Sequence, residues 1–269
     1  MFDGEDQPAM EHSAMTEIID QIRSEFLGNE RSVWIHPPQD RTTATNLTVF
    51  LDAEIYRGHV GAGAVLNQMQ GRLADSWFVF VSMHSVEART RECPCHPPFA
   101  QFLAKELLPW LEGRFPELKI VRQRVLVGLS YTGLAAAFAA LIQPGHFQKV
   151  IAQSGSFWWR DGWLGEQVRQ LAQPLPTEFY LTVGTRETQE NVRHSPEVLQ
   201  VVSQIAGVQR FRDALRDRGH LVQYAECDSG HYAECWRMTL PAALEWALPV
   251  AQSETSARAV NQPERSDGP

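Results

Sequence analysis

Apolar residues along the chain occur either in short continuous runs or at a helical spacing. The runs predict strands, the first two of them paired, at residues 31–36, 47–51, 77–83, 125–129, 179–187 and 221–227. The helical spacing and runs of good helix formers predict helices at residues 15–27, 59–73, 99–115, 134–140, 198–218 and 232–248. Gly219 is placed to end one of these helices as its C-cap. Alternating strands and helices are typical of an α/β fold with a doubly wound, mostly parallel sheet and helices on both faces.

The ends of the chain differ in composition from its centre. Residues 1–14 are polar and acidic, and residues 252–269 contain almost nothing apolar, so we expect a mobile N-terminal segment and a disordered C-terminal tail. The remaining residues, 15–251, are expected to form a single domain. The hydrophobic content of 43% is sufficient to fill the core of such a domain.

Charge and hydropathy exclude several classes of partner. The formal net charge is −8 and no runs of Lys or Arg occur, which argues against a nucleic-acid partner. No apolar stretch approaches the length of about 18 residues that a membrane span needs, and the N-terminus does not resemble a signal peptide. We therefore expect no membrane partner and a cytoplasmic location.

The four cysteines are too few for a disulfide scaffold in a chain of 269 residues. Cys93 and Cys95, followed by His96, suggest a zinc site whose further ligands would be Cys227, His231 and Cys235. The spacing of Cys93 and Cys95 is shorter than structural zinc sites use, so no metal site is predicted. Reduced, partly buried thiols are expected instead.

The most informative segment is the apolar run 125–129, which is followed by Ser130 and a helix rich in alanine. A serine in a sharp strand-to-helix turn has an exposed hydroxyl at a helix N-terminus, where negative charge is favoured. Gly128 allows the tight turn, and Gly133 allows the helix to approach the strand. Thr132 occupies a position where the G-x-S-x-G pattern has glycine. Ser130 is therefore the candidate nucleophile.

A base and an acid follow this serine in the order that α/β-hydrolases use. His231 lies in a loop just after the last predicted strand, and it is the candidate base. Glu187 ends the preceding predicted strand and is the candidate acid. The alternative acids are Glu190, Glu226 and Asp228. Together the three residues predict a two-step acyl transfer without a cofactor.

Several further motifs resemble those of the enterobactin (enterochelin) esterases, which belong to the esterase D-like branch of the α/β-hydrolases. The resemblance covers about residues 31–248 and rests on Arg89-x-x-Glu92 with Pro94-Cys95, and on the segments 106–110, 153–159, 184–187 and 230–237. It implies hydrolysis of ester bonds in a catecholate siderophore, which releases iron inside the cell. It also implies the roles given above for Ser130, His231 and Glu187.

The resemblance further implies an oxyanion hole made by the backbone N–H groups of Tyr131 and Glu54. Two positions depart from the family pattern. Ala53 replaces the glycine of Leu-Asp-Gly-Glu, and Thr132 replaces a glycine of the elbow.

Arginine and aromatic residues follow the predicted strand ends and suggest a site for an anionic aromatic substrate, because guanidinium groups bind negative oxygens and stack on rings. The arginines are Arg57, Arg89, Arg91, Arg160, Arg186 and Arg237. The aromatic candidates are Phe157, Trp158, Trp159 and Trp236. We assign Arg89, Arg237 and the three tryptophans to substrate binding, although Arg89 could instead be a structural partner of Glu92. Any iron is expected to arrive with the substrate.

Two other functions are compatible with these residues. One is a general carboxylesterase or an enzyme like S-formylglutathione hydrolase. The other is a binding protein that keeps the fold without turnover, against which the presence of both Ser130 and His231 argues.

Overall fold

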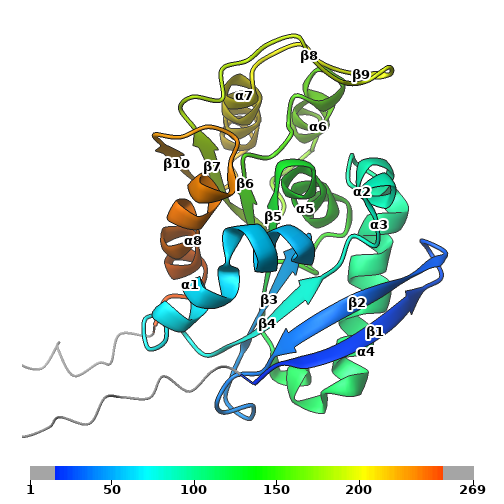
Figure 1. The fold of residues 1–269 in the computed structure, drawn as a ribbon, viewed down its shortest axis with the longest axis vertical. Coiled ribbons are helices and arrows are strands. Elements are labelled where there is room, and N and C mark those ends of the chain that lie inside the picture. The colour runs from blue at the N-terminus through cyan, green and yellow to red at the C-terminus, as the bar shows by residue number, and fades with distance from the viewer. Residues whose placement is uncertain (1–15, 251–269) are drawn as a thin grey trace, which may run out of the picture.

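The computed structural model describes residues 16–250, so the predicted terminal segments 1–14 and 252–269 lie outside the described residues. Eight strands form one sheet in the order β1-β2-β4-β3-β5-β6-β7-β10 (Figure 1). The strands are β1 (Ile18–Ser24), β2 (Asn29–His36), β3 (Asn46–Leu51), β4 (Ser76–Val81), β5 (Gln123–Leu129), β6 (Lys149–Gln153), β7 (Glu178–Gly184) and β10 (Val222–Cys227). All pairs from β4 to β10 are parallel, whereas β2 is antiparallel to both of its neighbours. The mostly parallel sheet is as predicted.

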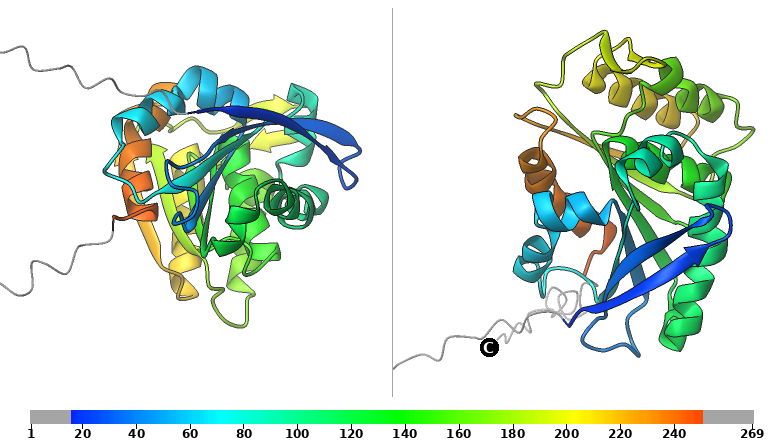
Figure 2. Two further views of the ribbon diagram at one scale, coloured as in Figure 1. Left: turned by 90° about the horizontal axis from the view of Figure 1, so that it is seen from below. Right: turned by 45° about the vertical axis from the view of Figure 1, so that its right-hand side comes forward.

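Helices cover both faces of this sheet (Figure 2). One face carries η1 (Glu54–Val60), α1 (Ala62–Gln68) and α8 (Ala233–Ala247). The other face carries α3 (Pro97–Gln101), η2 (Phe102–Leu107), α4 (Leu108–Arg114), α5 (Ser130–Ile142), α6 (Trp159–Arg169) and α7 (Gln204–Asp217). The short helices α2 (Val86–Glu92) and η3 (Pro116–Ile120) precede α3 and follow α4, respectively. None of the helices between residues 16 and 250 is both long and apolar enough to span a membrane.

Side-chain alternation along the strands divides the buried residues into two cores. In β4, Trp77 and Val79 belong to the core under α3 to α7, whereas Phe78 and Phe80 belong to the core under η1, α1 and α8. Successive side chains of a strand point to opposite faces, so a strand covered on both faces is apolar at every position. This explains why the central strands are continuous apolar runs in the sequence.

The helix predicted for residues 15–27 is wrong, because residues 18–24 form β1. Ile22 and Ser24 are buried, whereas Gln21 and Arg23, which alternate with them, are exposed. A spacing of four residues fits a strand as well as a helix, since four is also a multiple of two. Pairing with β2 along the whole strand decides between the two structures.

The predicted pairing of the first two strands of the sequence analysis is also wrong. β2 and β3 do not pair, because β4 lies between them, antiparallel to β2 and parallel to β3. A parallel neighbour requires a crossover connection, which η1 and α1 supply between β3 and β4. The helix predicted for residues 59–73 is shorter in the structure, where α1 covers residues 62–68. Gly61, in a left-handed conformation with φ of 70°, separates α1 from η1.

The helix predicted for residues 198–218 begins only at Gln204, after a hairpin of β8 (Val192–Ser195) and β9 (Val198–Gln200) that the sequence analysis missed. The side chain of Ser203 caps α7 by accepting a hydrogen bond from the N–H of Ala206 at 3.3 Å. Gly219 follows the end of α7 with φ of 82°, as predicted. The hairpin lies beside α6, beyond the end of the sheet where β5, β6 and β7 terminate (Figure 1).

Candidate active site

The turn between β5 and α5 brings Ser130 to the end of the sheet in a left-handed conformation with φ of 52°. A side chain at residue 128 would overlap the backbone of Thr132, so this position requires glycine. A Cβ at residue 133 would lie 3.0 Å from Cα of Gly155, so glycine there allows the close approach of the two backbones. The hydroxyl of Thr132 accepts a hydrogen bond from the N–H of Leu129 and donates one to its carbonyl. Thr132 thus fits the elbow by holding the turn together.

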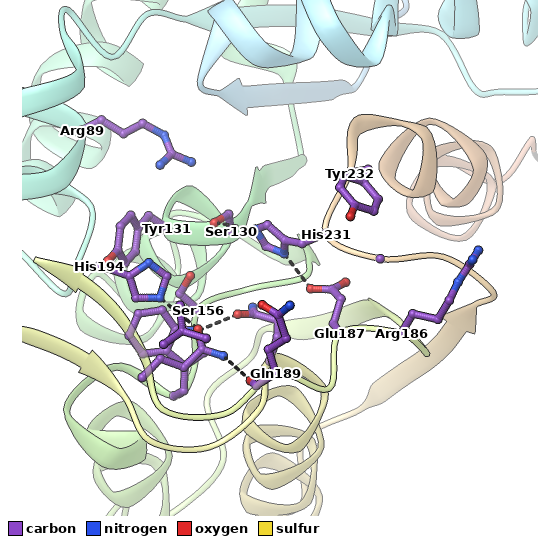
Figure 3. A pocket seen from close by; sticks show the side chains of 15 residues that line it. Arg89, Ser130, Tyr131, Ser156, Arg186, Glu187, Gln189, His194, His231 and Tyr232 are labelled. Carbon is purple, nitrogen blue, oxygen red and sulfur yellow. Dashed lines mark hydrogen bonds and ion pairs between the residues drawn. The ribbon is translucent and has the colours of Figure 1, made fainter.

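Ser130, His231 and Glu187 form one hydrogen-bonded chain (Figure 3). Nε2 of His231 lies 3.1 Å from Oγ of Ser130, and its Nδ1 lies 2.6 Å from Oε2 of Glu187. Because the carboxylate can only accept, Nδ1 carries the proton and Nε2 is free to accept from the serine hydroxyl. Three segments far apart in the sequence supply these residues, each following a parallel strand at the same edge of the sheet.

The carboxylate of Glu187 is held by two further donors besides His231. Its Oε1 accepts from Oγ of Ser154 at 2.6 Å and from the N–H of Gly184 at 2.7 Å. The side chain is only 1% exposed, so these hydrogen bonds replace water as its partners. Trp236 donates from Nε1 to the same serine hydroxyl at 3.1 Å, and its ring packs edge-on against the imidazole of His231.

None of the alternative acids lies beside the imidazole among the described contacts. Glu226 accepts hydrogen bonds from Tyr224 and Gln209, and the exposed Asp228 forms an ion pair of 3.4 Å with Arg186. Glu190 is also exposed and does not line the cavity at Ser130.

The two residues expected to supply an oxyanion hole lie at the N-termini of two helices, and these helices follow the neighbouring strands β3 and β5. Tyr131 is the second residue of α5, and Glu54 is the first residue of η1. The carboxylate of Glu54 accepts from the N–H of Met83 at 3.2 Å, which connects this turn to the end of β4. Ala53 is fully buried with right-handed torsion angles, so the position does not need the glycine of the family pattern.

A cavity of about 480 Å³ opens beside Ser130 and His231 (Figure 3). Its other walls come from residues that the sequence analysis did not assign to the site, most of them polar and three of them on the β8–β9 hairpin. These are Ser156, Gln189, Val192, His194, Gln200, Gln204 and Tyr232. Ser156 and Tyr232 lie within the segments 153–159 and 230–237 of the family resemblance, whereas no motif marks the hairpin residues, because the hairpin reaches the site only through packing against α6.

Arg89 and Arg186 line this cavity, but the other arginines of the predicted set do not. Nε of Arg89 forms an ion pair of 2.5 Å with Asp52, so the suggested partner Glu92 is not its partner. Glu92 instead pairs with the buried Arg31 and with Arg91.

Arg57 and Arg237 have partners elsewhere. Arg57 pairs with Glu17 and lies over the ring of Trp34. Arg237 donates to the backbone carbonyls of His59 and Val60, so its guanidinium caps η1 and is not among the residues that line the cavity.

The three tryptophans assigned to substrate binding occupy different positions. Trp158 lines the cavity, stacks on His194 with ring centroids 4.7 Å apart and donates to Gln204 at 2.5 Å. Trp159 lines a neighbouring cavity, and the buried Trp236 lies behind His231, outside the residues that line either cavity. Phe157 is buried in the core.

The cysteine prediction is half wrong. Cys227 and Cys235 form a disulfide that brackets the loop carrying His231, whereas Cys93 and Cys95 are free and buried, as expected. Two cysteines eight positions apart need not meet, and only the turn between β10 and α8 brings them together. Between residues 16 and 250, no group of three or more His, Cys, Asp or Glu side chains is arranged to hold a metal ion.

The family model described as "Putative esterase" matches residues 24–247, which is most of the chain. The chain belongs to this esterase family. The chain is 30% identical over 257 residues to the iron(III) enterobactin esterase of Dickeya dadantii, covering 88% of this chain and 56% of that relative. The enterobactin esterase FES of Shigella flexneri, crystallised in the presence of enterobactin, superposes with a TM-score of 0.71 at 28% identity. That match covers 86% of this chain and 57% of FES.

The siderophore hydrolase EstB of Aspergillus nidulans shares the fold at 16% identity, with a TM-score of 0.68 over 92% of this chain and 100% of EstB. These similarities confirm the α/β-hydrolase fold and the resemblance to the enterobactin esterases. The chain spans about half the length of the enterobactin esterases that it matches.

Proposed function

We propose that this esterase hydrolyses ester or lactone bonds of an anionic catecholate siderophore in the cytoplasm and thereby helps to release its iron. The observation that carries the proposal is the chain of hydrogen bonds from Ser130 through His231 to Glu187. A serine hydroxyl is a weak nucleophile until a base accepts its proton, and this arrangement provides such a base with a fixed tautomer.

In the first step, Nε2 of His231 takes the proton of Ser130 while Oγ attacks the ester carbonyl carbon. The N–H groups of Tyr131 and Glu54 hold the oxyanion that forms, and the left-handed turn at Ser130 supports this role because it puts the serine at a helix N-terminus. When the tetrahedral intermediate collapses, His231 returns the proton to the departing alcohol oxygen. The acyl group is then bound to Ser130 as an ester.

In the second step, His231 takes a proton from water, and the oxygen of the water attacks the acyl-serine carbonyl. Collapse of this second intermediate releases the acid, and the proton returns to Ser130. Glu187 stays ionised and stabilises the imidazolium, held by the donors Ser154 and Gly184. No cofactor takes part in either step.

The substrate class is supported by charge, by aromatic surface and by the relatives. Arg89 and Arg186 border the cavity, although the chain as a whole is acidic. Tyr131 and Trp158 line the same cavity, and the guanidinium of Arg89 lies 5.7 Å from the ring centroid of Tyr131. Such a cavity is suited to an aromatic ring that bears negative oxygens. The names of the relatives at about 30% identity point to the same substrate class.

Hydrolysis of a catecholate trilactone, followed by mass spectrometry of the products, tests this proposal. We expect acyclic 2,3-dihydroxybenzoylserine products with the wild type and none with the Ser130→Ala variant. A general carboxylesterase would instead cleave short nitrophenyl esters and leave the trilactone intact. A binding protein without turnover would cleave neither ester and would not react with a fluorophosphonate probe.

A further inference from the structure

A second cavity, of about 470 Å³, lies next to the first on the other side of Tyr131. Tyr131 lines both cavities and directly follows Ser130 in the sequence. The adjacent residues Trp158 and Trp159 are divided between the two, with Trp158 in the first cavity and Trp159 in the second. A molecule that has one group at Ser130 therefore has a second hollow within reach.

The second cavity is cationic and has an aromatic wall. Arg91, which pairs with Glu92, and Arg160 line it, and Glu197 is the one carboxylate among the lining residues. Burial lowers the pKa of the lining His96, so this side chain adds no charge near neutral pH. The guanidinium of Arg160 lies 4.6 Å from the ring centroid of Trp159.

Arg160 has no carboxylate partner among the described residues, in contrast to Arg89 in the first cavity. Its backbone is left-handed, with φ of 46°, and so are the two residues that follow it. Non-glycine residues seldom adopt this conformation, because Cβ crowds the backbone. The turn keeps an unpaired guanidinium over an indole ring at the edge of the cavity.

We propose that the second cavity binds another aromatic, anionic arm of the same ester whose scissile bond lies at Ser130. Arg160 and Arg91 bind the negative oxygens of that arm, and its ring packs against Trp159. This inference rests on the proposed function, and it assigns Trp159 to a different subsite from Trp158. It predicts that the esterase prefers substrates with at least two aromatic arms.

The test compares two esters of 2,3-dihydroxybenzoylserine. The linear ester of two units offers an arm to each cavity, whereas the methyl ester of one unit can fill the first cavity only. We expect the wild type to show at least tenfold higher kcat/KM on the two-arm ester, through a lower KM. In Arg160→Gln, the ratio of the two kcat/KM values should fall roughly tenfold, the size of one charge-assisted hydrogen bond. Trp159→Ala should reduce the same ratio.

Arg169→Gln is the matched control, because Arg169 lies on the same helix, pairs with Glu166 and is not among the residues that line the second cavity. The control should keep the wild-type ratio. An equal loss on both esters in Arg160→Gln, or a wild-type ratio near one, would overturn the second subsite and leave the proposed function intact. A wild type that cleaves nitrophenyl acetate but neither catecholate ester would overturn both.

Discussion

The guanidinium of Arg89 and the carboxylate of Asp52 form an ion pair of 2.5 Å at the border of the cavity beside Ser130. Asp52 is 3% exposed on its side chain and follows β3 in a left-handed conformation, directly before the turn that leads to Glu54. The pair therefore links the loop expected to supply an oxyanion-hole N–H to α2. Arg89 is therefore held by Asp52 and also lines the cavity.

Replacing Arg89 by glutamine should weaken binding of a charged substrate more than of a neutral one. We expect the ratio of kcat/KM for a ferric catecholate ester to that for a small neutral ester to fall roughly 10- to 150-fold, which corresponds to about 1.5 to 3 kcal/mol, the range for hydrogen bonds to charged groups. Added salt should reduce the difference in kcat/KM on the charged ester between the wild type and the variant, because salt screens the charge of Arg89, which only the wild type carries.

The control for this experiment is Arg72→Gln, which removes an exposed arginine paired with Glu245. It should leave the ratio at its wild-type value. If Arg89→Gln loses the same factor on both esters, Arg89 acts only by holding Asp52 and not by binding substrate.

Single and double variants of Ser130 and His231 should show that the two residues act as a unit. Ser130→Ala and His231→Ala should each lower kcat by roughly a thousandfold or more, and the double variant should lose little beyond that. Initial rates on a catecholate ester measure this effect. Multiplicative losses in the double variant would contradict the proposed proton transfer between Ser130 and His231.

The hydrogen bond from Ser154 to Glu187 leads to a graded prediction for the acid. Glu187→Gln should lower kcat strongly, because a glutamine cannot stabilise the imidazolium, whereas Ser154→Ala should cost roughly tenfold by removing one of three donors to the carboxylate. Steady-state kinetics separate the two effects. Glu190→Gln is the matched control, because Glu190 is exposed and does not line the cavity. Near wild-type rates for Glu187→Gln would indicate a Ser-His dyad.

The disulfide between Cys227 and Cys235 should stabilise the fold and keep His231 in place. Replacing both cysteines by alanine should lower the free energy of unfolding by about 2.5 kcal/mol, the loop-closure value for a separation of eight residues. Denaturant unfolding of both proteins, with and without a reductant, measures this loss. The reductant should lower the free energy of unfolding of the wild type and leave that of the double variant unchanged. Equal effects of the reductant on both proteins would contradict the presence of this disulfide.

Buried histidines should make the fold less stable in mild acid. His220 is 6% exposed, and burial lowers its pKa, so the unfolded chain binds its proton more readily than the folded chain. Stability should therefore fall as the pH drops below about 6.5, the ordinary pKa of histidine, and should continue to fall until the lowered pKa of the folded state is passed. Burial also lowers the pKa of His36 and of His96, so these two residues should likewise reduce stability in mild acid.

His220→Gln should make the slope of unfolding free energy against pH shallower between pH 7 and 5, by at most about 1.4 kcal/mol per pH unit. Urea unfolding at several pH values measures the slope. His59→Gln is the control, because His59 is exposed. A slope unchanged in the His220 variant would show that other groups cause the loss in acid.

Several elements of the site have signals that are local in the sequence. The apolar run before Ser130, the glycines at 128 and 133 and the alanine-rich helix predict the elbow, because only small residues allow such a close approach. The positions of Glu187 and His231 after later strands followed from the order of α/β elements. Parallel strands place such residues at one edge of the sheet whatever the details of packing.

Only the tertiary structure decided the contacts between distant segments. Residues 18–24 fit a helix and a strand equally by spacing, and pairing with β2 made them a strand. Arg89 and Asp52 are 37 residues apart, Cys227 and Cys235 are 8 apart, and Ser154 and Glu187 are 33 apart, and the folding of the chain between them brings each pair together. The hairpin at residues 192–200 and the cavity that Trp159 lines also arise from packing, since short polar strands carry no periodic signal. Local pattern thus predicted the candidate nucleophile and base and left four candidate acids, and packing placed Glu187 among these four beside His231.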